Sequence, residues 1–284
     1  MEALKKMKKK ILLFLLVCGL VIGLGSVPNA NAFTHLDTYW DLNAVDGTYF
    51  NVDDGITEAF SEFMYYAETN SHISPTGGIV DAGLAYATSI NTVAGTMPAD
   101  DEGLGSHYGF AFAWTDLTGQ VTSVAPDGTI NATYTSGTFN FYVDYNPYAL
   151  DFSNASTFTD GMLVATVALT SGGYTLDPNP GGTGSSYVLN GKFTYLLDDF
   201  WYDAAGVDLD DYPTDWVVSY SHGDNDPGSV DITYNADGSM DIFSQHDSSM
   251  EIGAVPEPAT MLLLGSGLLG LAGVGRKKKF FKKD

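Results

Sequence analysis

The chain has 284 residues, of which 35 are acidic and 12 are basic, and its net charge at pH 7 is −23. Phosphate backbones are bound by clustered lysine and arginine side chains, so this charge balance excludes nucleic acid as a partner. Aromatic residues make up 13% of the chain, whereas disordered segments are poor in them, and this excludes a mainly disordered protein.

The first 32 residues have the three zones of a secretory signal peptide. Five lysines precede residue 11, an apolar run covers residues 11–24, and a small, polar stretch ends in Ala30-Asn31-Ala32. An A-x-A ending predicts cleavage after Ala32. The alternative, a transmembrane helix, fits poorly because about 14 residues reach only about 21 Å across a hydrocarbon core of about 30 Å.

The only cysteine, Cys18, lies inside the apolar run. A lipoprotein signal would place a small residue before it, and Val17 stands there instead. Cleavage after Ala32 therefore leaves a mature chain without cysteine. Such a chain has no disulfides, no thiol catalysis and no cysteine-bound zinc.

Residues 33–254 are expected to form one exported, β-rich domain. Apolar and polar side chains alternate in four segments, 129–134, 138–143, 230–234 and 240–243. Sequences typical of turns separate these segments, including Ser136-Gly137 and Asp237-Gly238. Short strands at this spacing predict an all-β fold, either a sandwich or a barrel of antiparallel strands.

One segment of this domain has a helical pattern. Residues 56–67 carry apolar side chains at helical spacing, namely Ile56, Ala59, Phe60, Phe63, Met64 and Ala67. This spacing predicts a short amphipathic helix, which Asp53 and Asp54 would cap. A strand is the alternative, because Phe60, Glu62, Met64 and Tyr66 also fit a period of two.

A similar pattern occurs twice in the domain, at residues 128–142 and at residues 228–243. Each copy has a glycine, an alternating segment, a second glycine and another alternating segment. The repetition indicates either duplicated halves or two similar hairpins, because alternating strands joined at a glycine turn arise easily.

Nearly all of the positive charge lies outside this domain. Glu2, Glu257 and Asp284 are the only acids beyond residues 33–255, which hold 32 acids, one cation (Lys192) and a net charge of −31. Hard cations such as Ca²⁺ prefer carboxylate oxygens, so the aspartate clusters are candidate calcium ligands, although no EF-hand spacing fits them. The alternative is that the acids only confer solubility. The candidate ligands are Asp198, Asp199, Asp208, Asp210, Asp211, Asp224 and Asp226.

The sequence contains no recognisable catalytic motif. The five histidines form no H-E-x-x-H pair, and G-x-S-x-G and phosphate-loop motifs are absent. We therefore expect a protein that is not an enzyme, although a secreted hydrolase with paired carboxylates is compatible with so many acids. An alternative function is a lectin-like module that stacks sugars on Trp114, Trp201 and Trp216. These side chains could instead pack in the core.

The last 30 residues, 255–284, have the composition of a stop-transfer segment. Pro256-Glu257-Pro258 precedes an apolar, glycine-rich stretch over residues 259–275, and a basic cluster begins at Arg276. Cations after an apolar span resist translocation and favour the cytoplasmic face. The two prolines keep the preceding chain extended, a form that a processing enzyme can bind. We expect a single transmembrane helix that anchors the chain transiently.

These three elements in this order resemble the PEP-CTERM sorting tail, which exosortases recognise. Exosortases are membrane-embedded, transpeptidase-like bacterial enzymes. The resemblance implies that Pro256, Glu257 and Pro258 are the recognition motif and that Arg276 is the cytoplasmic retention signal. It also implies removal of the tail during export, with the rest of the chain secreted or delivered to the cell envelope.

The middle of the chain is similar to flocculation-associated PEP-CTERM proteins. The similar stretches are YGFAFAWTDLTG and SGTFNFYVDY within residues 108–145, GMLVATVALTSG at 161–172 and GKFTYLL at 191–197. This resemblance implies a non-enzymatic matrix protein that helps cells to aggregate with exopolysaccharide. Calcium that bridges the acidic domain to anionic polysaccharide, or to other copies, would provide a mechanism.

Overall fold

The structure, a computed structural model, describes residues 34–45, 54–177, 186–212 and 217–254, with only some of the side chains between 217 and 229. The predicted signal peptide with Ala30 and Ala32, and the tail with its sorting motif, lie outside these residues. Within the described part, ten strands form one antiparallel sheet and two more form a small ribbon. The prediction of an all-β, antiparallel fold is confirmed.

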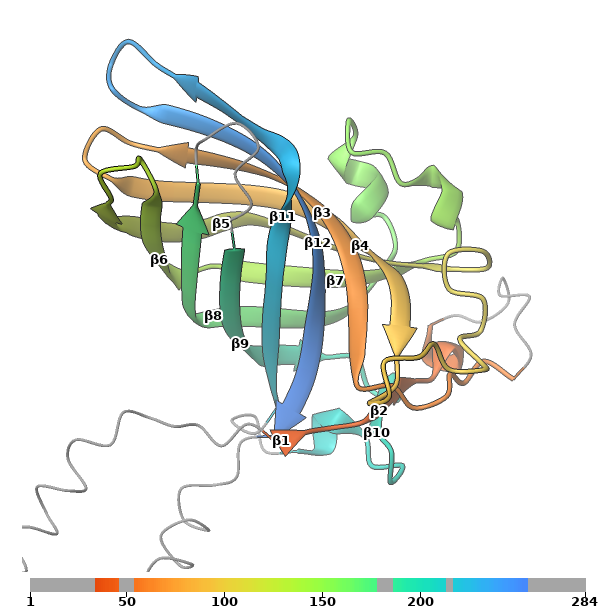
Figure 1. Cartoon of the computed structure of the whole chain (residues 1–284). Coiled ribbons are helices and arrows are strands. Elements are labelled where there is room, and N and C mark those ends of the chain that lie inside the picture. The colour runs from red at the N-terminus through yellow and green to blue at the C-terminus, as the bar shows by residue number, and fades with distance from the viewer. Residues whose placement is uncertain (1–33, 46–53, 178–185, 213–216, 255–284) are drawn as a thin grey trace, which may run out of the picture. The chain divides into compact units, whose positions relative to one another are not determined.

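The sheet closes on itself and forms a barrel (Figure 1). Around the barrel the strand order is β3, β4, β5, β6 with β7, β8, β9, β11 and β12, and β12 pairs back with β3. Strands β6 and β7 share one place, between β5 and β8. Closure removes the open edges that the two sheets of a sandwich would have. The barrel strands are β3 (Glu62–Ile73), β4 (Gly78–Asn91), β5 (Gly109–Val124), β6 (Ile130–Ser136), β7 (Thr138–Asp144), β8 (Met162–Leu176), β9 (Ser186–Leu196), β11 (Val217–Tyr234) and β12 (Met240–Ala254), and β1 (Thr34–His35) extends the sheet beside the end of β12.

The helix predicted over residues 56–67 is wrong, because this region leads into strand β3. Residues 62–69 alternate strictly between half-buried and buried, with Phe63, Tyr65 and Ala67 facing the interior. Strand β3 has ladder partners on both sides, β4 and β12, which satisfy its backbone more completely than a short isolated helix would. Asp54 caps no helix, since its carboxylate accepts the N–H of Ile56 in a turn.

The two similar sequence patterns fold differently, so neither duplicated halves nor two similar hairpins is correct. Residues 240–254 do return along β11 after a tight turn, in which Gly238 has a φ of 86°. Strands β6 and β7 do not pair with each other, and both run between β5 and β8. A Cβ at Gly137, between β6 and β7, would lie 2.8 Å from Leu117 Cα, so this glycine permits close approach to β5 and makes no hairpin turn.

One end of the barrel is filled by aromatic side chains around Trp40. Strands β2 (Thr38–Trp40) and β10 (Trp201–Asp203) form the small ribbon and place Trp40 directly opposite Trp201 (Figure 1). The fully buried Trp40 ring stacks on Phe110 at 4.5 Å and meets Phe60 edge-on at 4.8 Å. This packing excludes solvent from one end of the interior and leaves the remaining volume nearer the hairpin turns of β3–β4 and β11–β12. The described part of the chain also contains four 3-10 turns outside the strands, namely η1 (Leu42–Ala44), η2 (Pro147–Ala149), η3 (Ala155–Phe158) and η4 (Leu209–Asp211).

Candidate functional site

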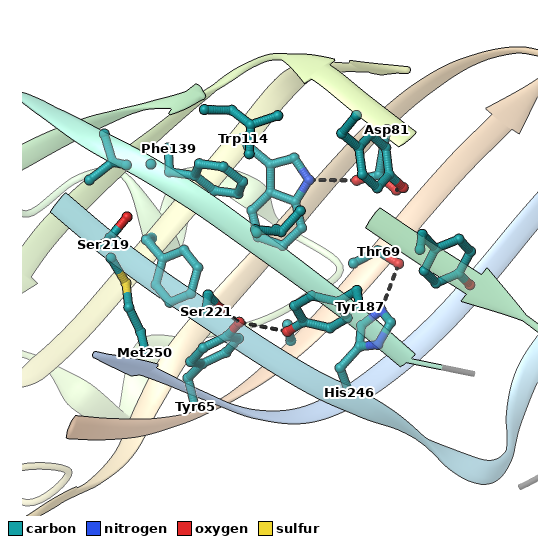
Figure 2. A pocket seen from close by; sticks show the side chains of 18 of the residues that line it. Tyr65, Thr69, Asp81, Trp114, Phe139, Tyr187, Ser219, Ser221, His246 and Met250 are labelled. Atoms are coloured by element: carbon teal, nitrogen blue, oxygen red, sulfur yellow. Dashed lines mark hydrogen bonds between the residues drawn. The ribbon is translucent and has the colours of Figure 1, made fainter. Parts of the chain in front are cut away.

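The interior of the barrel contains a cavity of about 60 Å³. Side chains from all around the barrel line it, because every second residue of each strand points inward. One wall, from β5 and β7, is aromatic and consists of Phe112, Trp114, Phe139 and Phe141. Trp114 and Phe139 are labelled in Figure 2. The opposite wall, from β12 and its neighbours, carries hydroxyl groups and a histidine.

Asp81, on β4, is the only carboxylate among the described residues that line the cavity. Trp114 Nε1 donates to its Oδ1 at 2.6 Å, and the hydroxyls of Ser71 and Tyr134 donate to its Oδ2. Burial disfavours the charged form and raises the pKa of Asp81 to about 6, although these donors partly oppose the rise. A single carboxylate does not provide the acid–base pair that glycoside hydrolysis uses.

A hydroxyl network covers part of the polar wall. Tyr65 OH lies 2.6 Å from Tyr187 OH and 2.5 Å from Ser221 Oγ (Figure 2). Tyr187 OH also donates to Ser248 Oγ at 2.6 Å. These four groups come from strands β3, β9, β11 and β12, so the network links strands across the seam where the barrel closes. Each hydroxyl in it has a partner.

His246, on β12, has one ring nitrogen with a partner and one without. Its Nε2 lies 3.1 Å from Thr69 Oγ1 and 3.0 Å from Ser244 Oγ (Figure 2), while Nδ1 is buried with no hydrogen-bond partner among the described residues. Burial lowers the pKa of His246 to about 4, so the ring is neutral at neutral pH. Tyr187 packs edge-on against the ring at 5.3 Å.

Many aspartates elsewhere stabilise turns. Each accepts the backbone N–H of the residue two positions further on, the geometry of an Asx-turn. Local hydrogen bonds of this kind hold the turns without any need for basic partners, and sequence patterns of the form Asp-x-Ser or Asp-Gly-Thr could have indicated them. The aspartates are Asp41, Asp54, Asp100, Asp101, Asp127, Asp144, Asp151, Asp203, Asp208 and Asp237.

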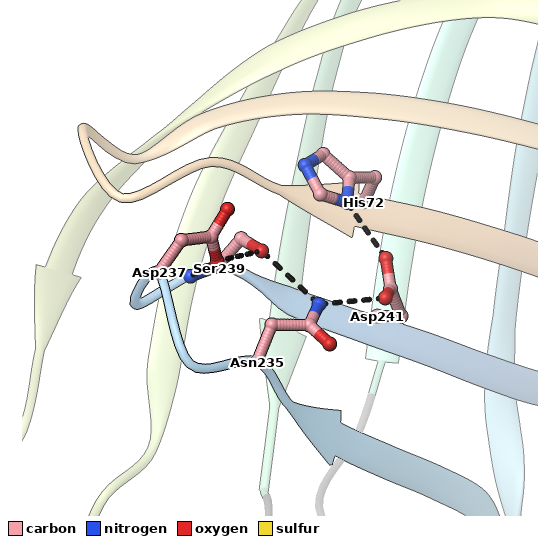
Figure 3. Close-up of polar contacts among 5 residues, drawn as sticks. All are labelled: His72, Asn235, Asp237, Ser239 and Asp241. Carbon is pink, nitrogen blue, oxygen red and sulfur yellow. Dashed lines mark hydrogen bonds and ion pairs between the residues drawn. The ribbon is translucent and has the colours of Figure 1, made fainter.

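The β11–β12 turn shows this arrangement in detail (Figure 3). Asp237 accepts the N–H and the hydroxyl of Ser239, and Asn235 donates to Ser239 Oγ and to Asp241 Oδ2. His72 Nδ1 lies 2.6 Å from Asp241 Oδ1. The hydrogen bond from Asn235 and the proximity of His72 lower the pKa of Asp241, so the turn keeps its acids ionised at neutral pH.

The structure brings together three of the seven candidate calcium ligands. Carboxylate oxygens of Asp198, Asp208 and Asp210 lie within 4.8 Å of one another. Burial raises the pKa of Asp210, and repulsion from the charges of Asp208, Asp198 and Asp211 raises it further. A bound cation would relieve this repulsion. The Asp199 carboxylate instead accepts the Tyr202 hydroxyl.

The remaining candidates do not join this group. Asp211 is exposed and is not one of the three clustered carboxylates. Asp224 and Asp226 lie in β11, with side chains outside the described set. A second group that the sequence did not indicate, Asp54, Asp100 and Glu102, has the same spacing.

Two of the three tryptophans considered for sugar stacking are buried. Trp114 lines the cavity and Trp201 packs against Trp40, with exposed fractions of 7% and 1%, so core packing is their role. Trp216 lies outside the described residues.

The tail matches a known family of sorting signals. Residues 254–277 match the model of the PEP-CTERM protein-sorting motif. The chain carries a PEP-CTERM sorting domain. The motif marks it as an exported protein that exosortase processes, destined for the cell envelope or the extracellular space. Among the described residues no helix has the length and apolarity needed to cross a bilayer, and the predicted span at 259–275 is not among them.

Other comparisons add little. No curated protein matches the chain. Solved structures with some similarity include a GFP-like protein from the marine copepod Chiridius poppei, with 10% identity and a TM-score of 0.11 over 68% of this chain and 63% of that one. Another is the Salmonella type III secretion secretin InvG, with 8% identity and a TM-score of 0.12 over 89% of this chain and 70% of that one.

Proposed function

We propose that the PEP-CTERM protein is a non-catalytic component of the extracellular matrix or cell envelope, with a structural or adhesive role in flocculation or biofilm. The supporting observation is the charge of the part that export delivers, 32 acids against one cation between residues 33 and 255. Such a surface repels anionic polysaccharide unless divalent cations lie between them. Calcium that bridges carboxylates to exopolysaccharide, or to further copies, provides the adhesion.

Chelation of divalent cations tests this role. EGTA is expected to disperse aggregates of cells that produce the protein, and millimolar CaCl₂ is expected to restore them, because carboxylates coordinate Ca²⁺ whereas Na⁺ only screens their charge. The measurement is settling rate, and the matched control is NaCl at the same ionic strength. Aggregation that persists in EGTA, or that NaCl restores equally well, contradicts the proposal.

The sorting motif gives a separate prediction. Changing Pro256, Glu257 and Pro258 together to alanine is expected to stop processing, so that the full-length chain accumulates in the membrane fraction, as it would in cells without exosortase. Mass spectrometry of the C-terminus measures the outcome. Glu251→Gln, upstream in β12, is the control and should be processed normally. A processed triple variant would mean that the motif is not the recognition element.

A further inference from the structure

The sorting tail begins where strand β12 ends. The match to the sorting motif covers residues 254–277, and Ala254 is both its first residue and the last residue of β12. Pro256 follows two positions later, so at most about 7 Å of chain separates it from the paired strand. A single residue, Val255, therefore connects the folded domain to the Pro-Glu-Pro motif.

The end of β12 is paired on both sides. Ala254 has a partner in β11 on one side and lies opposite Thr34 of β1 on the other. The pairing of β3 with β12 stops at Glu251, so β1 takes the place of β3 beside the last residues of β12. Leu36 continues this pairing, since its N–H donates to the carbonyl oxygen of Ile252 at 3.0 Å. The first residues of the exported domain thus hold the strand that leads into the sorting tail (Figure 1).

Strand β1 is the weaker of the two partners. It has two residues and pairs with β12 alone among the described strands, whereas β11 pairs with β12 along most of its length. His35 Nε2 lies 3.2 Å from Glu251 Oε2, but the histidine side chain is 50% exposed, and such ion pairs add little stability. Short terminal strands open at a lower free-energy cost than the core of a domain. Strand β1 can therefore leave β12 and return while the barrel stays folded.

Pairing at this position restricts access to the chain next to the motif. An enzyme that binds an extended peptide uses the backbone N–H and C=O groups of that peptide, and in a paired strand these groups are already in use. Proteases accordingly cleave folded proteins from locally opened states. Ile252 and Gly253, which precede the motif, are buried in the closed sheet. They become available to an enzyme only when the end of β12 separates from a neighbouring strand.

We propose that residues 34–36, paired with residues 252–254, form a latch on the sorting tail. While the latch is closed, it withholds the tail from exosortase, and exosortase processes the chain when β1 is released. The rate of processing then follows the opening of β1. The latch acts at the tail and not on the acidic surface, so it can fail while the matrix role holds, and the reverse.

A reversible disulfide tests the latch. His35 and Gly253 lie directly opposite each other, and cleavage after Ala32 leaves no other cysteine, so His35→Cys with Gly253→Cys can form one disulfide within the chain. Full-length protein from cells without exosortase is incubated with membranes that contain the enzyme, and its C-terminal mass is followed over time. The oxidised double variant should be processed at least about tenfold more slowly than the same protein reduced with dithiothreitol. Wild type with and without dithiothreitol is the control for effects of the reductant.

A longer connection provides an independent variant without cysteines. Six residues, Gly-Ser-Gly-Ser-Gly-Ser, inserted between Ala254 and Val255 lengthen the connection by up to about 20 Å. This protein should be processed at least about fivefold faster than wild type, because its motif is accessible while the latch is closed. The same insertion between Ala236 and Asp237, in the exposed turn before β12, is the matched control and should leave the rate unchanged.

The two changes together separate the latch from other effects. In a protein with both the disulfide and the longer connection, the rate of processing should no longer depend on reduction. Equal rates for the oxidised and reduced double variant, or a wild-type rate for the protein with the longer connection, would each overturn the proposal.

Discussion

Replacing Trp40 with alanine is expected to lower the free energy of unfolding by about 3–5 kcal/mol, as for large aromatic truncations in other cores. The ring is fully buried, and it contacts Phe110, Phe60 and Trp201 with centroid distances of 4.5, 4.8 and 5.7 Å. Its loss removes the centre of the aromatic packing that closes one end of the barrel. Urea unfolding followed by circular dichroism measures the change, and Tm should fall by roughly 10 °C.

Two further variants test whether the loss of buried ring volume causes the destabilisation of Trp40→Ala. Trp40 Nε1 has no hydrogen-bond partner among the described residues, so Trp40→Phe removes an unsatisfied donor together with part of the ring. Its cost should be smaller, below about 2 kcal/mol. Tyr148→Ala removes an aromatic ring that is 79% exposed and should change stability by less than about 0.5 kcal/mol. A Trp40→Ala protein as stable as wild type would show that the aromatic packing around Trp40 does not contribute to the stability of the fold.

The second large effect concerns Asp81 and His246, whose pKa shifts make opposite contributions to the pH dependence of stability. Burial raises the folded-state pKa of Asp81 from 3.8 to about 6. Its contribution to the free energy of unfolding is therefore fully present below pH 3.8 and is lost as pH rises through 6. The folded-state pKa of His246 is lowered from 6.5 to about 4, also by burial. Its contribution is present above pH 6.5 and is lost as pH falls through 4.

Each shift corresponds to about 3 kcal/mol at about 1.4 kcal/mol per pKa unit, so in wild type the two contributions largely cancel between pH 4 and 6.5. The free energy of unfolding of Asp81→Asn should therefore exceed that of wild type by about 3 kcal/mol at pH 7 and differ little from it below pH 4. Because this variant keeps His246, its stability should fall steeply as pH decreases from 6.5 to 4. His246→Phe should show the opposite slope, with stability rising as pH falls from 6 to 4.

Urea unfolding at several pH values between 4 and 7 measures these slopes. The double variant, Asp81→Asn with His246→Phe, is the matched control and lacks both contributions. If the difference in stability between Asp81→Asn and wild type does not change across this range, the carboxyl group is not buried as the structure places it.

The sequence predicted the barrel only as one of two all-β possibilities, since alternation in a strand reports which residues point inward and not how the sheet closes. Closure depends on the pairing of β12 with β3, residues separated by about 180 positions, and no local pattern encodes it. The same limitation explains the wrong helix at residues 56–67. Spacing favoured a helix there, but two neighbouring strands supply the ladder hydrogen bonds that hold Phe63, Tyr65 and Ala67 in a strand.

What the sequence determined by itself is the destination of the protein and its charge. Sorting signals are read as linear segments by the export machinery, so Pro256, Glu257 and Pro258 identify the tail without any fold, and charge is a sum over residues. Only the tertiary structure decided what the interior contains. Asp81 and His246 are 165 positions apart and belong to no motif, and they line one cavity because inward positions from different strands meet only when the sheet has closed.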